Sequence, residues 1–294
     1  MSVIEIKLGT TRARISTLGA ELVSLSRDGK EYLWQGDPAF WAGQSPLLFP
    51  NTGSFWNGVY RIDDLTYAME KHGFARTMEF SVVEQLESSV TFAIHSNDKT
   101  LSIYPFAFFL FVTYRLHDDG LEVSWMVRNE SDCDMHFAIG AHPAFNLPDY
   151  NADEKIHGYF SFATEKPIEY LIPTEKGCID DKHPRRLELD SDGMMAITAD
   201  TFDIDTYVIE SSHISRCTLL TPERKPYLAV DFDMAVLSLW APTAEHPDCP
   251  FVAIEPWAGS CDTVGYEGQL SERRHINHVG PGEAFHTAYR IILF

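Results

Sequence analysis

The feature that most constrains the fold of this chain is a succession of short, strand-like segments joined by turns. Residues 109–116 read FLFVTYRL and residues 121–127 read LEVSWMV, with HDDG between them. Apolar and polar residues alternate along the second segment, and Asp119-Gly120 is a pair that supplies the positive φ of a tight turn. These residues therefore predict a β-hairpin.

The same unit recurs along the chain. Further hairpins are predicted for Leu22–Leu33, Tyr60–Met69, Phe80–Ile94 and Leu187–Thr198, and a last strand for Ala288–Phe294. Helical periodicity is confined to short candidates at 38–43 and 200–204. Many short strands at hairpin spacing are typical of sandwiches and barrels. Because no Pro-, Gly- or Ser-rich linker divides the chain, we expect one large all-β sandwich domain over residues 1–294, with few short helices.

Composition excludes several kinds of partner. The 294 residues carry a formal net charge of -20 and lack the clustered Lys and Arg of a nucleic-acid binder. The first residues, MSVIEIKLGTTRAR, do not read as a secretory signal, and the longest apolar run, 106–112, is too short to cross a bilayer. Five scattered cysteines fit reduced thiols. We therefore expect a cytoplasmic monomer or homodimer with no nucleic-acid or membrane partner.

Three segments place titratable residues in apolar, strand-like surroundings: KHGFAR at 71–76, AIGAHPAFN at 138–146 and FVAIEPWAG at 251–259. Glu255 precedes a proline that cannot continue a central ladder, so we expect it at a strand end, partly desolvated and with a raised pKa. His142 likewise follows small apolar residues and precedes a proline. One such histidine alone is more often a satisfied core group, but three such segments together indicate an active site.

These segments resemble the aldose 1-epimerase (galactose mutarotase-like) family, especially its less characterised prokaryotic members. HGFAR, GAHPAFN and IEPWAG occur in the family's order, and the match extends to ISTLGAEL, WQGDPAFW, SPLLFP and LSLWAP elsewhere in the chain. The resemblance implies a β-supersandwich. It also implies an isomerase that interconverts the α and β anomers of an aldohexose or a derivative.

The resemblance assigns roles by motif. Glu255 corresponds to the general base on the C1 hydroxyl, and His142 to the general acid that protonates ring oxygen O5. His72 would polarise that ring oxygen. Ring opening needs one proton removed from O1 and another delivered to O5, which a carboxylate and an imidazole can do near neutral pH. No charge leaves the sugar, so we expect no metal and no redox cofactor.

Substrate binding is less sharply predicted. By motif, Arg76 and either Asp203 or Asp205 would hold sugar hydroxyls, with Asp205 fitting slightly better. Ser54 stands where many relatives have an arginine, and Arg76 or Arg61 could supply the missing guanidinium.

Four other residues are candidate pocket residues. Trp257 and Trp240 offer flat apolar faces for the C–H groups of a sugar, or else belong to the core. Gln44 and Asn146 could line a pocket, although Asn146 could instead cap a turn.

Three other functions stay open. The missing arginine favours a sugar-binding protein without turnover. A hexose-6-phosphate epimerase is a variant of the leading function, and the acidic charge weighs against it. His72, His142 and Glu255 could also form the two-His-one-carboxylate site of a metal-dependent hydrolase or isomerase. Cys133 and His136 are too few ligands for a separate metal site.

Overall fold

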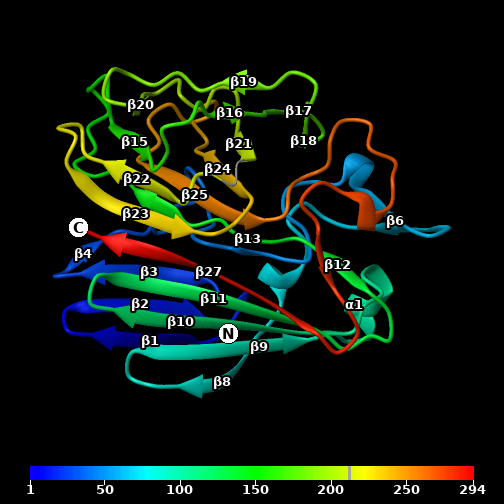
Figure 1. Cartoon of the computed structure of the whole chain (residues 1–294). Helices are drawn as coiled ribbons and strands as arrows, with labels where there is room; N and C mark the ends of the chain where they lie inside the picture. Colours follow the sequence, from blue (N-terminus) through cyan, green and yellow to red (C-terminus); the bar gives the residue numbers. More distant parts are fainter. Residues whose placement is uncertain (211–212) are drawn as a thin grey trace.

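The computed structural model describes residues 1–210 and 213–294, and the prediction of a large all-β sandwich is confirmed. In the described part of the chain, one antiparallel sheet has nine strands (Figure 1). In spatial order they are β20 (Met194–Ile197), β15 (Gly158–Phe162), β22 (Arg216–Leu220), β23 (Pro226–Phe232), β27 (Ala284–Leu293), β11 (Gly120–Asn129), β10 (Phe108–His117), β9 (Ser89–His95) and β8 (Ser81–Gln85).

Two smaller sheets lie behind the large one in the view of Figure 1. The first contains β1 (Val3–Leu8), β2 (Thr11–Ser16), β3 (Leu22–Arg27) and β4 (Lys30–Glu31). The second contains β21 (Tyr207–Glu210), β24 (Val236–Trp240), β25 (Phe251–Ala258), β13 (Ile139–Ala141) and β5 (Leu47–Leu48), and β14 (Ala144–Asn146) also pairs with β25.

The remaining elements are short. The strand pairs are β6 (Val59–Ile62) with β7 (Leu65–Ala68), β12 (Met135–Phe137) with β26 (Asn277–Val279), β16 (Glu169–Tyr170) with β19 (Arg185–Arg186), and β17 (Pro173–Glu175) with β18 (Cys178–Ile179). The helical elements are α1 (Asp98–Ile103) and the 3-10 turns η1 (Trp56–Gly58), η2 (Ala75–Thr77) and η3 (Leu270–Glu272). Among the described residues, no helix is long and apolar enough to cross a membrane.

Most predicted hairpins are confirmed, with one change at a turn. Strands β10 and β11 pair from Phe108–Asn129 to His117–Gly120, so Gly120 belongs to the strand and Asp118-Asp119 makes the turn. Neither Asp119 nor Gly120 has a positive φ. Glycine is needed at position 120 for another reason: an added Cβ would lie 1.9 Å from the carbonyl oxygen of Ile291 in the neighbouring strand.

Three local predictions are wrong. The Leu187–Thr198 hairpin does not form, because its second arm, β20, pairs with β15 instead. The helix candidates at 38–43 and 200–204 are turns and irregular segments. The one α-helix of the described residues is α1, which the periodicity did not indicate. Asn97 is its N-cap residue, and the Asn97 side chain accepts a hydrogen bond from the Thr100 N–H (3.1 Å) in a capping box.

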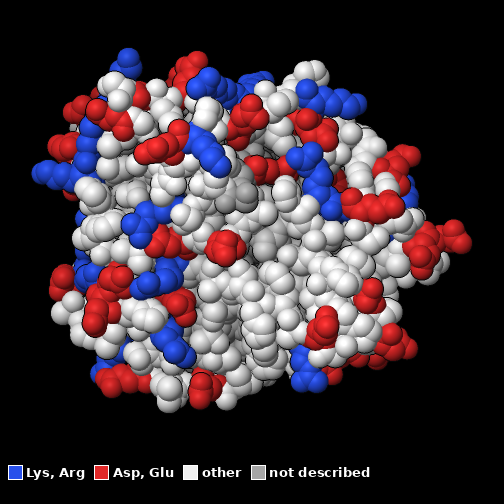
Figure 2. Space-filling model, in the orientation of Figure 1, with Lys and Arg blue, Asp and Glu red and all other residues white. Residues whose placement is uncertain are grey.

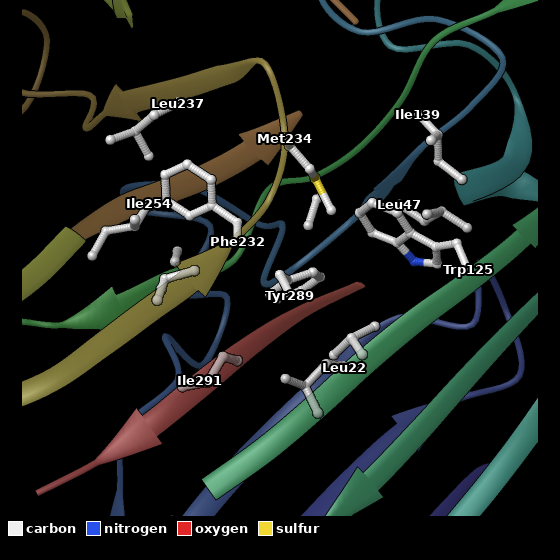
Figure 3. Close-up of a cluster of buried hydrophobic side chains, with 14 of the residues drawn as sticks. Leu22, Leu47, Trp125, Ile139, Phe232, Met234, Leu237, Ile254, Tyr289 and Ile291 are labelled. Atoms are coloured by element: carbon white, nitrogen blue, oxygen red, sulfur yellow. The ribbon is translucent and has the colours of Figure 1, made fainter. Parts of the chain in front are cut away.

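The hydrophobic core lies between the large sheet and the two smaller ones. In Figure 3, Phe232 and Ile291 of the large sheet point toward Leu237 and Ile254 of β24 and β25. Figure 2 shows one face of the molecule, with acidic and basic side chains interspersed over its left and upper parts and a largely uncharged area at the lower centre. The apolar faces of the sheets meet inside the molecule.

Phe49 is a test of this core. It is fully buried, and its ring contacts four other aromatic rings, those of Phe74, Tyr104, Phe108 and Phe137. We expect Phe49→Ala to lower the free energy of unfolding by about 3–5 kcal/mol, since a large cavity would remain. Urea denaturation measures this. The matched control is Phe109→Ala, on a ring that is 36% exposed, and an equal loss in both variants would contradict the prediction.

Candidate active site

A cavity of about 350 Å³ lies on the face of β24 and β25 that is turned away from the core. Side chains alternate along these strands, so Leu237 and Ile254 enter the core while Ser238 and Glu255 enter the cavity. Its lining residues are Trp41, Pro46, Gly53, Lys71, His72, Arg76, His142, Pro173, Gly177, Asp205, Thr206, Val208, Ser238, Trp240, Glu255, Trp257 and Cys261. All three predicted segments therefore meet here.

Glu255 lies in the middle of a strand and not at a strand end as predicted. Strand β25 continues through Pro256, which pairs with Leu237 of β24. The proline is tolerated because the neighbour on its other side is interrupted: β13 pairs with residues 257–258 and β14 with residues 251–253. The interruption is His142-Pro143, so the same break that accommodates Pro256 brings His142 opposite Glu255.

His142 and Glu255 form a close, buried pair. The distance from His142 Nε2 to Glu255 Oε1 is 3.5 Å, and the two residues are only 8% and 1% exposed. The imidazole is held by aromatic neighbours: Trp41 stacks on it with ring centroids 4.8 Å apart, and Trp240 meets it edge-on at 5.3 Å. The pair is therefore rigidly placed and shielded from water.

Burial shifts the pKa values of the pair in opposite directions. Burial raises the pKa of Glu255 well above 4.5, with nearby Asp205 adding to the effect, while Lys71 and the polar groups of Trp257 and Ser238 oppose it. Burial also lowers the pKa of His142 to about 3, and Lys71 contributes to that decrease. Burial therefore favours the neutral pair in the free protein, with the proton on the carboxyl and the imidazole uncharged.

His72 reaches the cavity from a backbone turn with φ 68°. The ring Nδ1 of His72 accepts a hydrogen bond from the Gly53 N–H (3.1 Å), and the backbone N–H of His72 donates to the Gly53 carbonyl (2.8 Å). Burial, together with the cations of Lys71 and Arg76 and the neighbouring His142, holds the pKa of His72 well below 6.5. The ring is thus neutral, with its proton on Nε2, and it is a hydrogen-bond donor there.

The predicted substrate-binding residues divide into two groups. Arg76, Asp205, Trp257 and Trp240 line the cavity with the pair. Arg76 also donates from Nη2 to the Lys71 carbonyl (3.0 Å), which leaves other guanidinium N–H groups for a ligand. Asp205 is held in a turn with φ 74°, next to Thr206.

Asp203, Gln44 and Asn146 are not among the residues lining this cavity. The side-chain amide of Gln44 donates to the carbonyls of Val23 and Trp34, at 2.9 and 3.0 Å. That of Asn146 donates to the carbonyls of Glu31 and Leu33, at 3.2 and 3.0 Å. Both amides therefore connect strands and loops of the framework, and Asp205 is the aspartate of its segment that reaches the cavity.

Several cavity residues were not anticipated. Lys71 precedes His72 directly, and its position in the motif was the available signal. Trp41 and Ser238 belong to WQGDPAFW and LSLWAP, but nothing in those segments distinguishes a cavity residue from a core residue. The contribution of Gly53 comes through its backbone, which no side-chain pattern reveals.

Polar atoms without a protein partner cluster at this site. Among the described residues, the buried His142 Nδ1, Ser238 Oγ, Glu255 Oε2 and Trp257 Nε1 make no hydrogen bond to protein. Buried polar atoms are normally paired. Four unpaired ones at one cavity leave hydrogen-bonding capacity unused there. No group of three or more His, Cys, Asp and Glu in the described residues is arranged to hold a metal ion.

The buried histidines predict an acid-sensitive fold. In the unfolded chain His142 titrates near 6.5 and in the folded chain at about 3, so the unfolded state binds more protons between these values. We expect the free energy of unfolding to fall by about 1.4 kcal/mol per pH unit for this histidine as pH drops below 6.5. Because the raised pKa of Glu255 acts in the opposite direction above 4.5, the difference in urea midpoints between wild type and His142→Asn across this range measures it. His142→Asn should make the dependence shallower, and the exposed His95→Asn is the control.

Comparisons with known proteins agree with this fold. The family model described as aldose 1-epimerase matches residues 2–222. The plasmid-encoded LacX protein of Lactococcus lactis subsp. lactis is 34% identical, over 99% of both chains. The arrangement of sheets defines a galactose mutarotase-like sandwich, and the chain belongs to the aldose 1-epimerase family.

Solved structures support the same assignment. A galactose mutarotase-like protein from Lactobacillus casei ATCC 334 is 31% identical and superimposes with a TM-score of 0.93, over the full length of both chains. A galactose mutarotase related enzyme from Lactobacillus acidophilus is 29% identical, with a TM-score of 0.89, over 100% of this chain and 97% of that one.

Proposed function

We propose that the protein catalyses anomer interconversion of an aldohexose by acid–base ring opening and reclosure. The observation that carries the proposal is the His142–Glu255 pair, 3.5 Å apart and buried on the wall of a cavity. In a hemiacetal, O1 and O5 are both bonded to C1. Two groups this close can therefore reach both oxygens of one bound sugar.

Ring opening moves one proton at each oxygen. Glu255, ionised in the sugar complex, takes the proton of the O1 hydroxyl as the C1–O1 bond becomes a carbonyl. His142, protonated in that complex, gives its proton to O5 as the C1–O5 bond breaks. The step converts an ion pair into a neutral pair, which is the state that burial favours.

Reclosure reverses both transfers after rotation about the C1–C2 bond. Glu255 returns its proton to the carbonyl oxygen, and neutral His142 takes back the O5 proton. The pair holds one proton in total before and after ring opening, so the site is ready for either anomer without exchange with solvent. Each positioned acid or base contributes about 10²- to 10⁴-fold.

The other cavity residues bind and polarise the sugar. The neutral His72 donates from Nε2 to the ring oxygen, which becomes more basic as the C1–O5 bond breaks. Asp205 and Arg76 hold hydroxyl groups, and Trp240 offers an apolar edge beside the imidazole of His142.

NMR exchange between the anomers tests the proposal. Wild-type protein should accelerate exchange of at least one hexose in a panel of free and phosphorylated sugars, and Glu255→Gln is the inactive comparison. Binding of a sugar with spontaneous exchange unchanged would instead identify a sugar-binding protein without turnover.

One observation favours a sugar with an anionic group. Two cations, Lys71 and Arg76, line the same cavity although the chain as a whole is strongly acidic. A sugar phosphate would be attracted to them by charge-assisted hydrogen bonds.

Lys71→Met tests this variant of the function. It should raise the KM of a hexose 6-phosphate by about 10- to 150-fold, because a hydrogen bond to a charged group contributes about 1.5–3 kcal/mol, and change that of the free hexose less. Arg61→Met is the control at a position outside the cavity. Equal effects on both sugars would exclude a role for Lys71 in binding the phosphate.

A further inference from the structure

A buried arginine lies behind the cavity and not in its lining. Arg273 is 5% exposed, and its guanidinium makes three hydrogen bonds. It donates from Nε to Asp262 Oδ1 (2.5 Å), from Nη1 to Asn51 Oδ1 (2.9 Å) and from Nη2 to the Ser260 carbonyl (2.9 Å). The guanidinium carbon also lies 4.2 Å from the centre of the Phe55 ring. A charge this deeply buried is costly unless such bonds compensate it.

These bonds hold the segment 51–56, which precedes β6. Asp262 Oδ2 accepts from the Trp56 N–H (2.8 Å), and the Asp262 N–H donates to the Ser54 carbonyl (3.0 Å). At the start of the segment, Asn51 accepts from Arg273 and donates from Nδ2 to the Gly53 carbonyl (2.9 Å). Arg273 and Asp262 therefore fix both ends of the turn that contains Gly53.

Gly53 is the contact between this segment and the cavity. Its N–H donates to His72 Nδ1, and its carbonyl accepts from the His72 N–H. Gly53 has φ 63°, and an added Cβ would lie 2.3 Å from Cys261 Cβ, so only glycine fits at this position. A shift of this turn would remove the N–H that keeps the proton of His72 on Nε2.

We propose that Arg273, together with Asp262, is a positioning residue that sets the tautomer and orientation of His72 through the Gly53 turn. Only the predicted effect of Arg273 variants on the rate of anomer exchange rests on the proposed function. Arg273 reaches His72 through two links, Asn51 and Gly53, and none of its three bonds is to a cavity-lining side chain. Ser54, which replaces the family arginine expected from the sequence, lies within the held segment.

The tautomer is measured first, by ¹⁵N NMR of the histidine rings in the sugar-free protein, with His72→Gln to assign the signal. Wild-type His72 should be neutral with its proton on Nε2. Arg273→Lys keeps the charge but can make only one of the three bonds in this geometry. It should give a mixed or Nδ1-protonated His72, and lower kcat for anomer exchange by up to about 100-fold with a smaller change in KM.

Arg216→Lys is the matched control, because Arg216 is paired with Asp231 on the surface of the large sheet. If Arg273→Lys does not fold by circular dichroism, Asp262→Asn is measured in its place, since it has the same shape and keeps only one of the two acceptor oxygens that bind the Trp56 N–H and Arg273 Nε. A wild-type His72 with its proton on Nδ1, or a folded variant with an unchanged tautomer, overturns the inference. A wild type that does not accelerate exchange overturns the proposed function instead, and leaves the tautomer result valid.

Discussion

Glu255→Gln is expected to abolish nearly all acceleration of anomer exchange while making the protein more stable. Glutamine keeps the shape of the side chain but cannot take the O1 proton, so kcat/KM should fall by about 10²- to 10⁴-fold. NMR exchange at equal sugar concentration measures the loss.

The gain in stability has a definite pH dependence. The folded protein holds the Glu255 carboxyl protonated above 4.5, where the unfolded chain ionises it. The favourable contribution of this group is therefore present at low pH and is lost as pH rises toward the folded pKa. Removing the carboxyl should increase the free energy of unfolding by about 1.4 kcal/mol for each pH unit above 4.5, until the folded carboxyl ionises.

Ser238→Ala is the control for these two measurements, because it alters the same cavity face without removing a titratable group. Loss of activity together with loss of stability in Glu255→Gln would show that the carboxyl has a structural role, and the assignment as general base would then be wrong.

His142→Asn should lose activity to a similar extent, and the double variant should lose little more. The two residues carry out the two proton transfers of the same ring-opening step. Once either residue is removed, the other has no partner for that step. We expect the effects of the single variants, about 10²- to 10⁴-fold each, not to multiply.

A double-variant cycle of kcat/KM measures this coupling. Fully multiplicative losses would contradict a shared proton and would favour two independent roles. The exposed His95→Asn accounts for any general effect of replacing a histidine in this protein.

Much of this arrangement could be predicted from the sequence, and the limits have physical causes. HGFAR, GAHPAFN and IEPWAG predicted that His72, His142 and Glu255 lie close together, and all three line one cavity. The strand-end position predicted for Glu255 was wrong. The rule that proline ends a central strand considers that strand alone and does not include a break in the neighbouring strand. That break, at His142-Pro143, depends on how β13 and β14 both pair with β25.

Other features depend on contacts between distant parts of the chain. Gln44 and Asn146 have side chains suited to a sugar site, yet both are used to join framework segments. The sequence favoured Asp205 over Asp203 only slightly, because the choice depends on a backbone turn with φ 74° at Asp205. No local sequence pattern pointed to Arg273, since its three hydrogen-bond partners are 11, 13 and 222 residues away.

Because of the break between β13 and β14, the proposed proton-transfer residues and the proposed sugar-binding residues lie on different kinds of structure. His142 and Glu255 are held by the pairing of one continuous strand with two short ones, so their spacing depends on the framework of the sandwich. Lys71, Arg76 and Asp205 come from loops and turns around the cavity. Exchange of these loops among related proteins should therefore alter which sugar is accepted, while the spacing between His142 and Glu255 stays the same.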